Sequence, residues 1–476
     1  MIDPLASTSL SLQSVDLRIR EAEEKYDLLR HTVSNWCVWP LIRQKCVATL
    51  RNLPTGKSAE TCEFTFVDRI ILALKAIPRL IILPKVQYVI IASSLNRRTQ
   101  QEDGLYKDVY FDDLLLQLDA YFKIEQADSK DFVYHSKSAF IKSDFTSTIF
   151  VLIAALLSRI IIPSHIQRAA RNLIADLKQA DLPCPEEHSL LRTLCLFFWS
   201  KELYIWLLRR LDPKFLFLIN AYNNHAIVAA AKELGIRVIE FQHGFLSCHH
   251  TGYSWSTYAH RYKAHMPIPD QLFLYGEFWK QELEVNGFWD DELQSVGSLR
   301  VDTFRQRRFE RKHVCTIVVT TQNLDTERLI AFLLQFLQIA QGKLRVCLFI
   351  KLHQNEVDRS IYEKAFGRED NVHIIAGNAA PSTFELLAFS HFHVSIYSTC
   401  HYEAIALGTP TVILPLTGHE AVLHLHCAGH ALLAQTPKEL FQIALQWQEI
   451  GISPEVGKHY FSADALESMK RALFIN

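Results

Sequence analysis

Apolar positions along the chain follow two different periods, and the change from one to the other predicts an α/β protein. Residues 12–33 carry apolar side chains at alternating spacings of three and four, which predicts a helix that packs on the protein or pairs with a second copy. Residues 64–85 are apolar and basic. We expect a core helix that ends at Pro78, and the alternative is a helix lying on an anionic membrane. Residues 149–162 are too short to span a bilayer, so we favour a buried helix over an interfacial one.

Short β-branched runs mark the strands. Residues 86–92 predict a first buried strand, and residues 215–241 predict a strand–helix–strand unit, which is typical of a parallel sheet. Residues 163–212 are helical, rich in leucine. Further strands are expected at 272–275, 316–320, 346–352, 372–375, 393–396 and 411–414, and further helices at 111–118, 326–341, 382–388, 402–407 and 462–474.

These elements divide the chain at a polar, charged segment, 297–312. We therefore predict a helical N-terminal extension at 1–85 and a first Rossmann-like domain at 86–300. A second Rossmann-like domain is predicted at 301–460, followed by a C-terminal helix at 461–476. The fold class is α/β, with two doubly wound sheets.

Composition narrows the function classes. The 476 residues are 49% hydrophobic, which is ample for two cores, and the formal net charge of −1 argues against a dedicated nucleic-acid partner. Ten cysteines are scattered without a C-x-x-C pair, as expected for reduced thiols, and the first residues lack a signal-peptide pattern. We expect a cytoplasmic protein, with a peripheral position at the inner membrane as a further possibility.

The second domain holds the clearest candidate chemistry. Ser398 and Thr399 stand in the turn between a strand and a helix, where hydroxyl and N–H groups at the carboxyl edge of a parallel sheet bind anions such as phosphate. Glu403 lies one turn further on and fits the two hydroxyls of a ribose. An acid three residues after the cap would indicate ordinary capping, and neither hydroxyl residue has one.

Two other strand ends point to the same edge. Lys351 and His353 end the strand at 346–352, and an imidazole there can hydrogen-bond a phosphate or protonate a leaving group. Gln322 and Asn323 follow the strand at 316–320 in a loop of hydroxyls and amides that precedes a helix. We predict that these four residues contact a donor substrate; the alternative for each is an ordinary loop residue.

In the first domain, His243 follows a strand in a Gln-His-Gly turn and is a candidate base, with a structural histidine as the alternative. Tyr253 belongs to an aromatic, polar loop that suits the face of a sugar. Arg97 and Arg98 lie in the polar loop after the first strand. We assign Tyr253 and the two arginines to acceptor binding.

Four motifs together resemble those of a known family. They are Lys351–Gln354, Ser398–Glu403, Gln242–Gly244 and Gly297–Asp302. Over roughly residues 215–430 the chain resembles bacterial two-Rossmann glycosyltransferases of the GT-B type. More narrowly, it is similar to capsule and surface-polysaccharide transferases, including sialyltransferases, Kdo transferases and CDP-glycerol glycerophosphotransferases.

The resemblance implies two domains facing a cleft, with a nucleotide-sugar donor on the second domain and a polysaccharide or lipid-linked glycan acceptor on the first. It implies a transferase that needs neither a metal nor a cofactor, with a last helix that crosses back to the first domain. His353, Ser398 and Thr399 would stabilise the departing phosphate, and His243 would activate or position the acceptor hydroxyl. The catalytic carboxylate of the sialyltransferases has no evident counterpart, which leaves the base open.

Two other functions stay open. A nucleotide-sugar 2-epimerase also has two Rossmann domains and a strand–Ser–helix–acid run, and the TGHEAV segment after Pro415 resembles its next loop. Its first strand, however, leads into a G-x-R-P-E turn, whereas SSLNRR follows the first strand here. The third candidate is a non-catalytic scaffold of a polysaccharide-assembly system that dimerises through residues 12–33.

Overall fold

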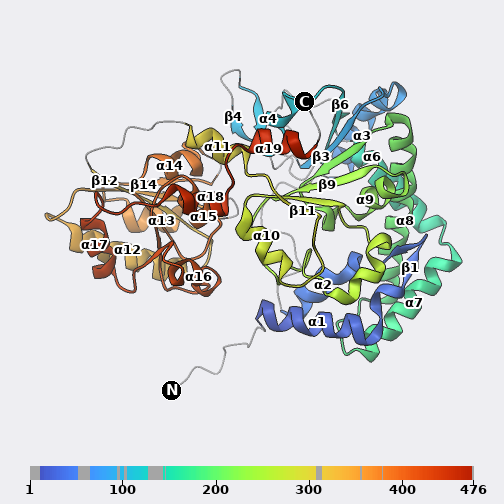
Figure 1. The fold of residues 1–476 in the computed structure, drawn as a ribbon, viewed down its shortest axis with the longest axis horizontal. Helices are drawn as coiled ribbons and strands as arrows, with labels where there is room; N and C mark the ends of the chain where they lie inside the picture. Colours follow the sequence, from blue (N-terminus) through green and yellow to red (C-terminus); the bar gives the residue numbers. More distant parts are fainter. Residues whose placement is uncertain are drawn as a thin grey trace. The chain divides into compact units, whose positions relative to one another are not determined.

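The computed structural model describes residues 11–51, 65–93, 97–100, 104–126, 143–144, 146–306, 314–353, 356, 358–377 and 379–473 (Figure 1). The chain forms two compact units. Described residues up to Leu274 and those of Trp279–Gln294 form the first unit, whereas Tyr275–Phe278 and those from Ser295 onward form the second. Each unit is built around its own sheet.

The described part of the first unit contains a seven-stranded sheet in the order β11-β10-β9-β8-β3-β6-β7. Neighbouring strands from β7 to β10 pair in parallel. The chain places β6 and β7 on one side of β3 and β8 to β11 on the other, as in a doubly wound sheet, so β3 and β8 flank the switch point. The strands are β3 (Tyr88–Ser93), β6 (Tyr121–Gln126), β7 (Ser143–Asp144), β8 (Phe215–Leu218), β9 (Arg237–Phe241), β10 (Gln271–Leu274) and β11 (Leu293–Ser295).

Strand β6 was not predicted, because two charged residues interrupt its apolar pattern. The ammonium of Lys123 lies 2.6 Å from Asp112, 3.2 Å from Asp108 and 3.7 Å from Glu125, and all four side chains are fully buried. Burial raises the pKa of Asp112 to about 6 in spite of the nearby lysine. Pairing within the fold therefore hides charges that a sequence pattern assigns to the surface.

Helices α3 (Phe66–Ile81), α6 (Thr146–Ile160), α8 (Glu187–Leu211) and α9 (His225–Glu233) share an apolar cluster with one face of this sheet. This cluster is the core of the first unit.

Two predictions about these helices were wrong. Helix α3 does not end at Pro78 but continues to Ile81, because a proline in the last turn removes only one hydrogen bond of the helix. The helix at 149–162 is not fully buried, since Leu156 and Ile160 are 59% and 68% exposed.

The N-terminal segment is an integral part of the first unit. Helix α1 (Leu12–Tyr26) ends earlier than predicted, at a left-handed Asp27, and a hairpin of β1 (Thr32–Val33) and β2 (Trp36–Cys37) leads to α2 (Pro40–Leu50). The guanidinium of Arg43 on α2 is buried and donates to Glu23 on α1 at 2.6 Å. The same guanidinium donates to the carbonyl of Ser254 at 3.0 Å, which ties both helices to the loop after β9.

The remaining described elements of this unit are shorter or peripheral. Helix α4 covers Asp112–Leu115, only the middle of the predicted helix at 111–118, and α7 (Ser164–Gln179) precedes α8. They also include η1 (Leu28–Arg30), β4 (Arg97–Gln100), β5 (Tyr106–Asp108), η3 (Ala221–Asn223), η4 (Thr257–His265) and α10 (Glu277–Glu284), the last of which starts in the second unit.

No single described helix is long and apolar enough to cross a membrane; α6 and α7 meet that requirement only as a pair bent by 87°.

The described part of the second unit contains a six-stranded sheet in the order β14-β13-β12-β15-β16-β17, and its neighbouring strands pair in parallel. Numbered along this unit, the order is 3-2-1-4-5-6, which is the order of Rossmann folds. The strands are β12 (Cys315–Thr320), β13 (Val346–Lys351), β14 (Val372–Ile375), β15 (Phe392–Ser395), β16 (Thr411–Ile413) and β17 (Leu432–Leu433).

Helices cover both faces of this sheet. Helices α12 (Thr326–Ala340), α13 (Ser360–Phe366) and α17 (Pro437–Leu445) pack on one face, whereas α14 (Thr383–Phe389) and α15 (Cys400–Ala406) pack on the other. The other helices are α11 (Leu299–Arg305), η5 (His419–Ala421), α16 (Leu423–Cys427), α18 (Pro454–Tyr460) and α19 (Ala465–Ala472).

The Gly297–Asp302 motif begins the second unit and holds its C-terminal segment. Gly297 has a φ of 89°, and a Cβ there would lie 2.4 Å from the carbonyl of Ser462. Asp302 accepts a hydrogen bond from the amide of Ala465 at 2.7 Å. This motif therefore anchors α19 within the second unit; a crossing of this helix to the first domain stays a prediction.

Candidate functional site

The second unit has its switch point between β12 and β15. The connections leave these two strands in opposite directions, and ligands of doubly wound sheets bind outside the carboxyl ends of the strands at such a point. Gln322 follows β12 and Ser398 follows β15. The Nε2 of Gln322 donates to the Oγ of Ser398 at 3.0 Å, so the structure brings these two predicted residues together across the switch point.

The loop after β15 combines a local turn with a hydroxyl that does not cap the following helix. Ser398 Oγ also accepts from the amide of Cys400 at 3.2 Å, which is the local bond that we weighed as the alternative. Thr399 is the N-cap residue of α15, and its hydroxyl makes no capping bond. The thiol of Cys400 lies among the side chains of Ser398, Glu403 and Thr320, and its pKa is raised by burial and then by Glu403. Glu403 is therefore close to the same edge.

A third loop joins this edge from β16. Asp325 accepts from the amide and the hydroxyl of Thr417 at 3.0 and 2.8 Å. Gly418 has a φ of 98°, a conformation that favours glycine. It packs closely against Tyr397 and Leu324, since an added Cβ would lie 3.1 Å and 3.4 Å from their side chains. The loops after β12, β15 and β16 thus hold each other at the switch point.

The strand end at β13 is held by its own lysine. The ammonium of Lys351 is buried and donates to the carbonyls of Ala376, Ala379 and Pro381 at 2.9, 2.5 and 3.1 Å. Burial lowers the pKa of Lys351 to about 8. These three bonds use all three N–H groups of the ammonium, so Lys351 supports the loop after β14. Its contact with a donor substrate stays a prediction.

His353 comes next and stands on a rigid support. Its amide donates to Thr321 at 3.0 Å, and the Thr321 hydroxyl donates to the buried Glu356. Tyr362 donates to the other oxygen of Glu356 at 2.8 Å. The backbone of His353 is therefore fixed beside the loop that carries Gln322. Asn323 is exposed, with a φ of 53°, and its donor contact stays a prediction.

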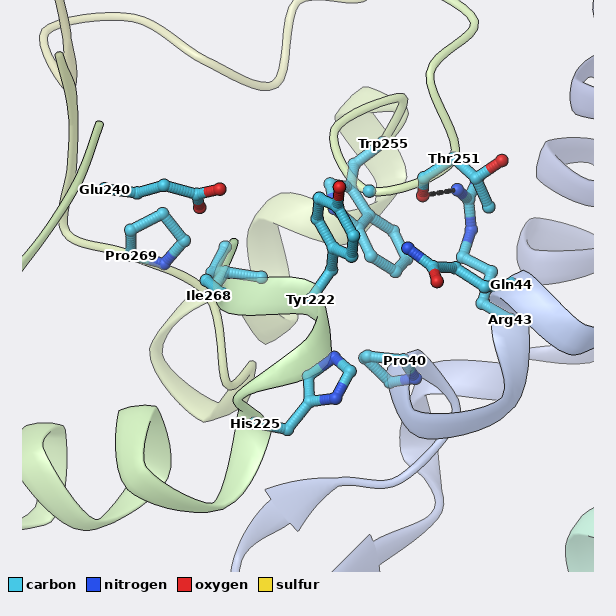
Figure 2. A pocket seen from close by; sticks show the side chains of 12 residues that line it. Pro40, Arg43, Gln44, Tyr222, His225, Glu240, Thr251, Trp255, Ile268 and Pro269 are labelled. Atoms are coloured by element: carbon cyan, nitrogen blue, oxygen red, sulfur yellow. Dashed lines mark hydrogen bonds between the residues drawn. The ribbon is translucent and has the colours of Figure 1, made fainter. Parts of the chain in front are cut away.

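The first unit has a small pocket beside the carboxyl ends of β8 and β9. Figure 2 shows Glu240 entering it from the sheet, Tyr222 and Trp255 on one wall, and Arg43 and Gln44 reaching in from α2. Its lining residues are Pro40, Arg43, Gln44, Ala221, Tyr222, His225, Glu240, Thr251, Gly252, Trp255, Ile268 and Pro269. The N-terminal extension thus forms a wall of this pocket.

Glu240 is the most unusual residue of the pocket. Its side chain is fully buried, and one carboxyl oxygen accepts a hydrogen bond from the hydroxyl of Tyr253. The other oxygen receives no well-aligned hydrogen bond from the described residues. Burial raises the pKa of Glu240 to about 7, against the opposing effect of Tyr253 and the backbone of Ala221. A carboxyl group with a pKa near neutral can exchange a proton at working pH.

Of the predicted residues of the first domain, Tyr253 is bonded to this carboxyl and His243 contacts a residue that lines the pocket. His243 follows β9, and its Nε2 lies 3.2 Å from the hydroxyl of Tyr222, a wall of the pocket. Tyr253 is only 2% exposed and reaches the pocket through its bond to Glu240, so its contact with an acceptor stays a prediction. Arg97 and Arg98 lie on β4, and their side chains are outside the described residues.

Sequence reasoning missed Glu240 and the wall from α2. The signal for Glu240 was present, because an acid in the middle of the apolar strand RVIEF is retained in a core only with a partner or a function. The contribution of α2 had no such signal, since Arg43 looks like any surface arginine until its partners Glu23 and Ser254 are known.

No family model matches the chain, and no curated protein sequence matches it. Solved structures do match. A candidate UDP-N-acetylglucosamine 2-epimerase from Listeria monocytogenes aligns with a TM-score of 0.50 at 12% identity, over 82% of this chain and 96% of that one. The UDP-GlcNAc 2-epimerase from Neisseria meningitidis, bound to UDP-GlcNAc, gives 0.47 at 16% identity, over 82% and 100%. MurG from Acinetobacter baumannii gives 0.45 at 11% identity, over 82% and 99%.

At this level of identity the likeness to the Listeria protein concerns the fold alone. It agrees with the strand orders of both sheets. The chain therefore has the predicted GT-B fold class, two Rossmann-like units in one polypeptide with additional helices at the N-terminus. This fold occurs both in glycosyltransferases and in nucleotide-sugar 2-epimerases.

Proposed function

We propose that the protein is a glycosyltransferase that moves a sugar from a nucleotide-activated donor to a surface polysaccharide or lipid-linked glycan, without a metal. The observation that carries this proposal is the switch point of the second unit, where Gln322 and Ser398 meet within hydrogen-bonding distance. Amide and hydroxyl donors at such an edge suit a phosphate, and fixed dipoles stabilise the charge that develops as the phosphate leaves.

Each residue has a role in this proposal. His353, Ser398 and Thr399 contact the departing phosphate, and Glu403 binds the ribose. The acceptor oxygen forms a bond to the anomeric carbon while the bond from that carbon to the phosphate oxygen breaks, so the nucleotide leaves. Glu240 takes the acceptor proton, because its pKa lies near 7. His243 positions the acceptor indirectly, by its contact with Tyr222 in the wall of the pocket. Glu240 is thus our candidate for the base that the sequence left open.

Nucleotide binding tests the first step. The purified protein is screened by thermal shift against CMP, CDP, UDP and GDP, since a ligand bound only to the folded state raises its melting temperature. We expect at least one nucleotide to do so, and Ser398→Ala to weaken its binding about tenfold by removing one strong contact. Thr436→Ala, at the N-cap of α17, is the matched hydroxyl control and is expected to leave the affinity unchanged. If none of the four nucleotides stabilises the protein, the proposal fails.

A nucleotide-sugar 2-epimerase is the second candidate. One observation favours it: the TGHEAV segment joins the switch point, because Thr417 is bonded to Asp325 and Gly418 packs on Tyr397. Product analysis separates the two reactions. With UDP-GlcNAc and no acceptor, an epimerase forms a second sugar nucleotide, whereas a transferase forms no epimer and releases nucleotide only when an acceptor is present.

A further inference from the structure

Helices α3 and α6 of the first unit pack on each other (Figure 1). Both helices expose apolar side chains to solvent. Most of the large exposed apolar residues in the described part of the chain belong to 67–82 and 151–162. We propose that this surface, the α3–α6 face, docks the protein on an anionic lipid membrane. The proposal goes beyond the transferase activity and does not depend on it.

The exposed side chains of α3 form one stripe. Val67, Leu74 and Ile81 are 62%, 59% and 75% exposed, and the spacing of seven residues places them on the same side of the helix. Leu72 and Ala76 are buried, and Ala76 belongs to the apolar cluster that α3 shares with the sheet. Apolar residues therefore occupy both the core side and the solvent side of this helix.

Helix α6 continues this surface. Leu156 and Ile160 are exposed, and Ile161 and Ile162 beyond the helix end are 47% and 37% exposed. Phe150 of the same helix is buried in the core of the unit. An exposed apolar surface of this extent is uncommon on a protein that has no partner there.

An aromatic residue with a polar edge lies beside α6. Trp206 on α8 is 37% exposed and packs on Phe150 with ring centroids 6.4 Å apart. The guanidinium of Arg210 lies 4.1 Å from the indole ring. Tryptophan and arginine side chains of this kind are typical of the boundary between lipid headgroups and acyl chains.

The charges on these helices are complementary to an anionic surface. Arg69, Lys75 and Arg159 are exposed, and no acidic residue follows Asp68 on α3 or occurs on α6. Asp68 itself is bonded to Thr65 in the capping box of α3. An apolar face with basic side chains around it is the pattern of a helix that lies in the membrane interface.

The charges also argue against the other occupant, a second copy of this chain. A twofold contact through this face would place the same patch against itself, and Arg69, Lys75 and Arg159 would then meet a rim of equal sign. An anionic membrane removes this repulsion.

Vesicle sedimentation tests the proposal with the full chain. The probes are vesicles of phosphatidylcholine mixed with phosphatidylglycerol and vesicles of phosphatidylcholine alone, each at low and high salt. We expect binding to the mixed vesicles at low salt and weaker binding in the other three conditions. A basic residue near an anionic surface contributes about fivefold to binding, so Lys75→Glu with Arg159→Glu is expected to reduce it more than tenfold.

The apolar contribution is tested with Leu74→Asp combined with Leu156→Asp. Both side chains are exposed, so the variant is expected to fold, and circular dichroism with a melting curve checks this. The matched control combines Val285→Asp with Leu17→Asp, which are exposed apolar residues of the same unit outside the α3–α6 face. We expect the first variant to lose at least tenfold in vesicle affinity and the control to retain it.

Three results would overturn the proposal. The wild-type protein fails to bind mixed vesicles; the Leu74 and Leu156 variant binds as well as the control; or the wild type forms a dimer that this variant abolishes, which would make the face a self-interface.

Discussion

Replacement of Glu240 by glutamine is expected to change stability and activity in opposite directions. The carboxyl is fully buried, and its pKa rises from 4.5 to about 7 because burial penalises the charged form. Between pH 4.5 and 7 the folded state therefore binds more protons than the unfolded state, so stability falls as the pH rises through this window. The loss is complete above pH 7 and amounts to about 3 kcal/mol, at about 1.4 kcal/mol for each unit of pKa.

Glu240→Gln removes this loss because the amide stays neutral and its oxygen can still accept from Tyr253. At pH 8 the variant should melt roughly 6–12 °C above the wild type, and at pH 4 the two should melt at nearly the same temperature. Transferase activity should fall by about 10²–10⁴, the usual contribution of a general base. The gain in stability with a loss of activity would be the mark of a functional group held in an unfavourable site.

The measurement is a melting curve by calorimetry at several pH values between 4 and 8, with turnover measured in parallel. Glu24→Gln, an exposed acid of the same unit on α1, is the control and is expected to leave both quantities unchanged. If the pH dependence of melting is the same in wild type and Glu240→Gln, the carboxyl does not titrate near neutral pH. The assignment of Glu240 as a base would then be refuted.

Three further predictions concern the second unit. His353→Ala should lower turnover by about 10²–10⁴ with an unchanged melting curve, and near-normal activity would contradict its role. Gly297→Ala should destabilise the unit by about 2 kcal/mol or more, because its φ is 89° and the new Cβ would meet Ser462, whereas Gly451→Ala, in open space, should not. Burial lowers the pKa of His401 to about 3. The free energy of unfolding should therefore be highest above pH 6.5 and fall below it, by about 2 kcal/mol at pH 5, because only the unfolded state then binds the proton. Chemical unfolding of the wild type and of His401→Asn, each above pH 6.5 and at pH 5, checks this.

The sequence by itself determined the fold class and one of the two candidate sites. Strands such as Phe215–Leu218 and Cys315–Thr320 are runs of apolar residues, which parallel sheets covered on both faces require, and short helices between them imply crossovers. Because the carboxyl ends of parallel strands share an edge, residues at strand ends can be placed together without coordinates. Gln322 and Ser398 are an example, and they meet at 3.0 Å.

Only the tertiary structure decided the features that depend on partners far away in the chain. The charge of Lys123 makes β6 resemble a surface segment in the sequence. In the fold, Asp108 and Asp112 pair with this lysine in the core. Glu240 is a candidate base because burial within the fold raises its pKa. Arg43 lines the pocket because Glu23, on another helix, holds its guanidinium. The energy of a charged or apolar group depends on its surroundings as well as on its own chemistry, and a local sequence pattern does not contain those surroundings.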